Sequence, residues 1–100
     1  MEAALPCDSV FYNSLYEGIE NLLSDLEPDW SPAELEPIRR DIENGQVDLA
    51  TEQLAAACVL LNKPLTPDLV ARIGVLAERQ GLASSIYLQR LRGRAAELGI

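Results

Sequence analysis

The side chains of this chain that could take part in chemistry are mainly carboxylates. The chain has sixteen acidic residues, eight basic residues and no histidine. Glu34 with Glu36, and Asp41 with Glu43, form two pairs separated by two positions. Paired carboxylates can serve as acid and base in one reaction, provided that one of them is kept protonated. Residues two apart on a helix point away from each other, so both pairs are interpreted as solvated faces.

Histidine is absent, which excludes the Ser-His and Cys-His catalytic arrangements and most zinc sites. Cys7 and Cys58 are too few and too far apart for a disulfide framework or a zinc site. Cys58 lies in the apolar run AAACVLL, where a free cysteine behaves as a small hydrophobic residue. No phosphate-binding, dinucleotide-binding or calcium-loop motif is present. We therefore expect a protein that is not an enzyme and has no catalytic residue, no cofactor and no metal.

The charge is divided along the chain. Residues 1–58 hold thirteen acidic and two basic residues, a net charge of -11, whereas residues 59–100 have a net charge of +3. Such an acidic half favours a partner with a basic surface and argues against nucleic acid, although ordinary acidic solubility explains it equally well. Arg90 and Arg94 share a helical face and could grip an anion. We expect them instead to bridge to acids of neighbouring helices or to lie in water.

Residues 24–37, SDLEPDWSPAELEP, combine five acidic residues with the only tryptophan and no basic residue. Trp30 precedes a capping-box motif and has two interpretations. It packs against Leu35 as a hydrophobic staple, or it is an exposed aromatic anchor inside an acidic rim, which is the composition of a binding hot spot. The second interpretation defines a hypothetical partner-binding site made of Trp30, Glu34, Glu36, Asp41 and Glu43.

Apolar residues recur at spacings of three and four along the whole chain, which is typical of amphipathic helices. Ser31-Pro32 and Thr66-Pro67 are helix starts, and Gly45 and Gly81 are helix ends. Pro37 is expected to bend or restart the second helix. The predicted helices cover residues 9–26, 32–44, 47–61, 67–80 and 83–98. The first would be capped by Asp8 or Ser9.

These spacings also predict which side chains are buried. Gly74 is expected to allow close contact between helices. The residues expected to face inward include Phe11, Tyr12, Leu15, Ile19, Leu22 and Leu26 in the first helix, Leu49, Ala50, Leu54, Ala57, Cys58 and Leu61 in the third, and Ile86, Tyr87, Leu91, Ala95 and Leu98 in the last.

Short connections between helices predict one all-α domain over residues 1–100, a compact antiparallel bundle of about five helices. The first residues lack a basic region and a long apolar run, so we expect no signal peptide. No apolar stretch is long enough for a membrane span. We therefore expect a cytoplasmic protein that does not bind membranes.

Two segments carry a resemblance to a known family: LEPIRRDIENGQVDLATEQL, with its helix-Gly-helix junction, and KPLTPDLVARI, a Thr-Pro step into a helix. With them, residues 35–82 resemble the MafI-type immunity proteins of bacterial polymorphic toxin systems. The resemblance implies a small cytoplasmic α-helical protein that binds and neutralises a cognate toxin domain. It implies no catalytic residues and assigns no interface residue, and residues 1–34 lie outside it.

The leading functional hypothesis is therefore an immunity protein whose acidic face is complementary to a basic toxin surface. The alternative is a small helical adaptor or regulatory module that binds another protein or nucleic acid through its Arg90–Arg94 end. A carboxylate-based enzyme is the weakest hypothesis, because no histidine or cofactor motif supports it. The sequence leaves the oligomeric state open.

Overall fold

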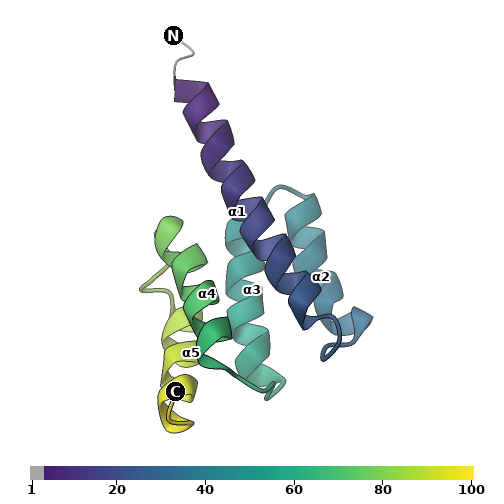
Figure 1. Ribbon diagram of the computed structural model, residues 1–100, viewed down its shortest axis with the longest axis vertical. Coiled ribbons are helices and arrows are strands. Elements are labelled where there is room, and N and C mark those ends of the chain that lie inside the picture. The colour runs from purple at the N-terminus through teal and green to yellow at the C-terminus, as the bar shows by residue number, and fades with distance from the viewer. Residues whose placement is uncertain (1–3) are drawn as a thin grey trace.

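The computed structural model describes residues 4–100, including the side chains of Phe11 and of residues 13–100. The described chain is all-α and contains no strand. Figure 1 shows its five helices, which are α1 (Ala4–Leu26), α2 (Pro32–Glu43), α3 (Val47–Leu60), α4 (Pro67–Arg79) and α5 (Ile86–Glu97). The predicted all-α bundle of about five helices is confirmed.

The two predicted helix starts are confirmed. The Ser31 hydroxyl accepts a hydrogen bond from the Glu34 amide at 3.2 Å, and the Glu34 carboxylate accepts one from the Ser31 amide at 2.9 Å, which completes the capping box. Thr66 caps α4 in the same position by accepting from the Leu69 amide at 3.1 Å. The expected restart at Pro37 is wrong, because α2 continues through it to Glu43.

The first helix begins earlier than predicted. Asp8 and Ser9, expected as N-caps, lie inside α1, which starts at Ala4. Pro6 is the third residue of this helix. The first four amides of a helix have no partner within it, so proline loses no hydrogen bond there and is compatible with the earlier start.

Helix ends are set by residues with positive φ. Gly45 and Gly81 follow α2 and α4 with φ of 77° and 74°, which confirms both predicted ends. Asn62 takes the same left-handed conformation after α3, with φ of 52°. The amide of the next residue, Lys63, then donates to the Cys58 carbonyl at 3.0 Å, as in a Schellman motif. This turn directs Lys63 back toward the start of α2.

The centre of the fold is α3, which contacts each of the other four helices. Consecutive helices are antiparallel, as the α2–α3 pairs Asp41 with Gln53 and Glu34 with Lys63 show. In contrast, α5 runs parallel to α3, because Ser85 bonds to Glu52 and Arg94 to Asn62 further along both helices. Helices α2 and α5 thus lie on opposite sides of α3 (Figure 1).

The core contains most of the residues expected there, including Leu15, Ile19, Leu22, Ala50, Leu54, Cys58, Leu91 and Ala95. Other expected core residues are partly exposed, and for these the prediction is wrong: Phe11, Leu49, Leu61, Ile86, Tyr87 and Leu98. Val47, Ala55 and Leu88 are buried instead. In α3 the buried stripe is rotated from the predicted one, because this helix is apolar on nearly all sides and periodicity alone does not choose its inner face.

Close helix contact occurs at Gly18, not at Gly74 as predicted. A Cβ atom on Gly18 of α1 would lie 3.1 Å from the Leu76 side chain of α4, whereas one on Gly74 would meet nothing. Burial raises the pKa of the Cys58 thiol to about 12, so this cysteine stays protonated in the core. The side chains of Cys7 and Tyr12 lie outside the described residues.

Candidate partner-binding surface

Trp30 belongs to the core. Its side chain is 4% exposed and packs in the same cluster as Leu35, so the interpretation as an exposed aromatic anchor is wrong. The alternative interpretation as a staple near the start of α2 agrees with this burial. The indole therefore contributes to stability rather than to a partner contact.

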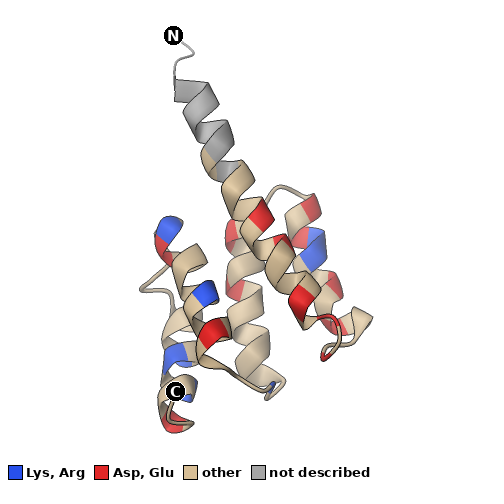
Figure 2. Ribbon diagram, in the orientation of Figure 1, with Lys and Arg blue, Asp and Glu red and all other residues tan. Residues whose placement is uncertain are grey.

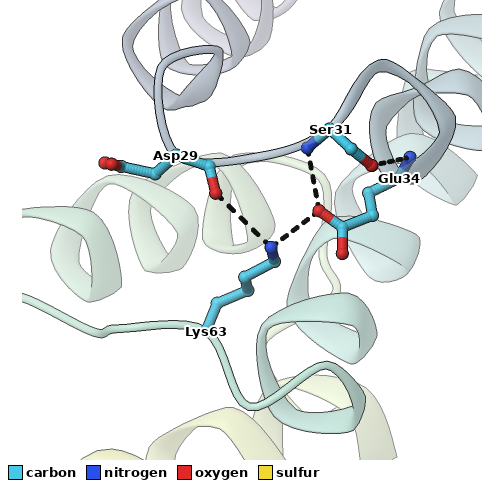
Figure 3. A network of polar contacts seen from close by, with 4 residues as sticks. All are labelled: Asp29, Ser31, Glu34 and Lys63. Atoms are coloured by element: carbon cyan, nitrogen blue, oxygen red, sulfur yellow. Dashed lines mark hydrogen bonds and ion pairs between the residues drawn. The ribbon is translucent and has the colours of Figure 1, made fainter.

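The ammonium group of Lys63 contacts several groups around Trp30 and the start of α2. Lys63, the only lysine, lies in the α3–α4 connection and places its Nζ 2.6 Å from Glu34 Oε1 (Figure 3). The same Nζ donates to the Asp29 carbonyl at 3.4 Å and sits 5.2 Å from the centre of the Trp30 ring. Glu34 is thus used twice, as the cap partner of Ser31 and as the counter-ion of Lys63. Both contacts of the Glu34 carboxylate are therefore made within the molecule.

This arrangement predicts a pH dependence. The hydrogen bond from Lys63, aided by the amide of Ser31, holds the pKa of the Glu34 carboxyl below its ordinary value. A lowered pKa contributes stability that is fully present above the unfolded value of about 4.3 and is lost as the pH falls through the folded value. We expect Glu34→Gln to be less stable near neutral pH and to lose less stability on acidification. Urea denaturation of both proteins at about pH 7 and about pH 3 checks this. A stability difference that is the same at both pH values would contradict it.

The acidic segment 24–37 is largely neutralised within the molecule. Four of its five carboxylates pair with a cation, at N–O distances between 2.6 and 3.2 Å. The pairs are Asp25–Arg72, Glu27–Arg39, Glu34–Lys63 and Glu36–Arg40. Two of the cations come from the basic half of the chain, so this segment does not present the uncompensated charge that its composition suggests.

The five residues of the predicted site do not share one surface. Asp41 lies on the α3 side of α2 and accepts a hydrogen bond from Gln53. Glu43 lies on the α1 side, where it lines a hollow with Glu20 and Arg39. Trp30 is in the core, and Glu34 and Glu36 are in ion pairs. Only Glu43 among them is both exposed and free of a cation.

Six exposed carboxylate side chains of the described residues have no ion pair, and three of them lie near one another where α1 meets α2, whereas Asp29, Asp48 and Glu78 lie apart from them. Glu17 and Glu20 follow each other by one turn on α1, and Glu43 faces Glu20 across the hollow. No lysine or arginine of the described chain pairs with these three residues, since Arg39 beside them is bound to Glu27 at 2.6 Å. Figure 2 shows acidic residues on α1, α2 and the start of α3, and most basic residues on α4 and α5. We name Glu17, Glu20 and Glu43 the acidic edge.

The arginines of α5 are largely engaged. Arg94 donates to Asn62 at 2.6 Å and lies 3.5 Å from Glu97, and Arg92 donates to the Ala83 carbonyl at 3.0 Å. Arg90 is exposed. Arg90 thus lies in water, one of the two positions expected for these arginines, whereas Arg94 pairs with an acid of its own helix and not of a neighbouring one.

Neither a metal-ligand cluster nor a membrane-spanning helix is found among the described residues. They contain no group of three His, Cys, Asp or Glu side chains placed to hold a metal ion. None of their helices is both long and apolar enough to cross a membrane.

Comparison with known proteins does not assign the chain to a family. No family model matches the chain, and neither a curated protein nor a solved structure matches it. The resemblance of residues 35–82 to immunity proteins therefore stays a prediction. The acidic edge, defined by geometry and charge alone, is the candidate partner-binding surface.

Proposed function

We propose that this protein is an immunity-type binding protein that acts in the cytoplasm and neutralises a toxin domain without any catalysis of its own. Its partner is a domain with a basic surface, which it meets through the acidic edge. The proposal combines the resemblance of residues 35–82 with the charge distribution on the folded chain.

The observation that carries this proposal is the contrast between two sets of carboxylates. Four of the five in residues 24–37 are paired with a cation within the molecule, whereas Glu17, Glu20 and Glu43 are exposed and pair with no lysine or arginine of the described chain. An uncompensated cluster on a rigid helical surface attracts a cationic partner and accelerates its association. Toxin domains that act on nucleic acids or nucleotides are often basic around their active sites, so such a surface would suit an inhibitor of them.

Co-expression tests this function. The proposal requires a neighbouring gene for a larger secreted protein, and the C-terminal domain of that protein is the partner to use. We expect that domain to arrest bacterial growth when expressed alone, and this protein to restore growth and to co-purify with it. Glu78→Lys, which changes an exposed carboxylate on α4 away from the acidic edge, serves as a control that keeps both properties. Growth arrest that persists despite ample folded protein, with no complex on purification, would contradict the proposal.

A further inference from the structure

A pocket opens where α1, the α2–α3 turn and the end of α4 come together (Figure 1). Its volume of about 350 Å³ lies in the range of pockets that hold small molecules. Three parts of the chain line it, and the described residues they contribute are Phe11 and Leu15 of α1, Gly45, Val47 and Asp48 around the α2–α3 turn, and Arg79 and Gln80 at the end of α4. We name it the junction pocket. No residue of the acidic edge lines it, so it is a separate site.

Two opposite charges line the junction pocket, and neither is neutralised within the described chain. Asp48 and Arg79 are both exposed, and no ion pair of the described residues includes either of them. The guanidinium of Arg79 lies 5.9 Å from the centre of the Phe11 ring, a cation–π contact that favours its position at the pocket. An arginine and an aspartate that line one pocket without pairing with each other can both pair with a ligand that carries two charges.

Gln80 adds an oriented hydrogen-bond acceptor. Its Nε2 donates to Thr51 Oγ1 at 2.9 Å and to the Leu76 carbonyl at 3.0 Å. A carbonyl oxygen only accepts, so the second bond fixes which end of the Gln80 carboxamide is the nitrogen. No buried side-chain nitrogen or oxygen of the described residues lacks a partner, so the unpaired Gln80 Oε1 is open to solvent. This oxygen and the Asp48 carboxylate are the acceptors available to a cation in the pocket.

The remaining side chains of the lining are apolar. Leu15 and Val47 belong to the core and close the pocket toward the interior, and the partly exposed ring of Phe11 lies at its α1 side. An apolar group that enters the pocket is removed from water against these side chains. The junction pocket therefore combines a site for an anion, a site for a cation and an apolar wall.

We propose that the junction pocket binds a free α-amino acid with an apolar side chain. The carboxylate of the ligand pairs with Arg79, its ammonium group pairs with Asp48 and Gln80 Oε1, and its side chain packs against the apolar wall. A ligand with a single charge would leave either Arg79 or Asp48 without a counter-ion. This binding goes beyond the proposed neutralisation of a toxin and does not depend on it.

An NMR chemical-shift titration with three ligands of matched shape tests the proposal. L-Leucine carries both charges, isocaproate lacks the ammonium group, and isoamylamine lacks the carboxylate. We expect L-leucine to bind the wild-type protein with a dissociation constant of about 1 mM or tighter, with the largest shifts at the amides of the pocket. Each analogue should bind about tenfold more weakly, because it loses one charge-assisted pair. This comparison uses only the wild-type protein, so it does not depend on the folding of any variant.

Matched variants then identify the residues. Arg79→Gln and Asp48→Asn should each weaken the binding of L-leucine by about tenfold. The same two changes at exposed, unpaired residues outside the pocket, Arg90→Gln and Asp29→Asn, should leave it unchanged. Circular dichroism checks that all four variants are folded.

Three results would each overturn the proposal. The first is the absence of any shift with L-leucine at about 10 mM, well above the expected dissociation constant. The second is an analogue that binds as tightly as L-leucine. The third is an equal affinity for L-leucine in the pocket variants and in their matched controls.

Discussion

Replacing Leu54 with alanine is expected to lower the free energy of unfolding by about 2–5 kcal/mol, the range for buried leucines. Leu54 is fully buried in the middle of α3, the helix that contacts the other four. Its removal leaves a cavity that no single helix can close by moving. Urea denaturation measures the effect as a lower midpoint at an unchanged slope.

The same helix supplies the control for this prediction. Leu60→Ala removes the same atoms from a side chain that is 78% exposed, and should change stability by no more than about 0.5 kcal/mol in the monomeric protein. Equal losses of stability for Leu54→Ala and Leu60→Ala would contradict the orientation of α3, in which Leu54 faces the core and Leu60 faces solvent.

Trp30→Ala should be equally damaging, at about 3–5 kcal/mol, the usual cost of removing a buried aromatic side chain. The substitution deletes a core side chain that is 4% exposed and also removes the ring beneath the ammonium of Lys63. Trp30→Phe, which keeps an aromatic ring, should lose only part of this stability. Thermal and urea unfolding of both variants provide the measurement, and an unchanged unfolding midpoint for Trp30→Ala would contradict the buried position.

Two of the helix starts were predictable because their causes are local, whereas α1 begins before the predicted residue 9 and α5 begins at Ile86, after the predicted residue 83. The capping box at Ser31 and the Thr66–Pro67 start depend on residues within four positions of each other, and both form as expected. The turn at Asn62 was harder to predict, because asparagine only sometimes replaces glycine in the left-handed position.

The orientation of the helices was less predictable. The side chains of Leu49 and Leu61 were expected to face the core and are exposed, whereas Val47 and Ala55 are buried. On a helix that is apolar on nearly every side, the inner face is chosen by its neighbours and not by its own periodicity. The same ambiguity accounts for the exposed leucine side chains of α3, Leu49 and Leu60.

The predicted site failed for a related reason. Counting charge along the chain predicted an uncompensated acidic segment around Trp30, but the fold supplies cations from distant positions, Arg72 for Asp25 and Lys63 for Glu34. Such pairing is visible only in three dimensions. Glu17 and Glu20 were not predicted as part of a site, because only the packing of α1 beside α2 brings Glu20 near Glu43.

The central claim, that the acidic edge binds a basic toxin domain, is tested most directly by association kinetics at two salt concentrations. The partner to use is the toxin domain identified by the co-expression test described above. The proteins to compare are the wild type, Glu20→Lys, Glu43→Lys and the control Glu78→Lys, whose charge change is the same but lies on α4. We expect the wild-type and control association rates to be equal and to fall as salt rises. Reversal at Glu20 or Glu43 should lower the rate at low salt by roughly tenfold and flatten its salt dependence. Rates that are independent of salt and unaffected by both reversals would contradict the claim.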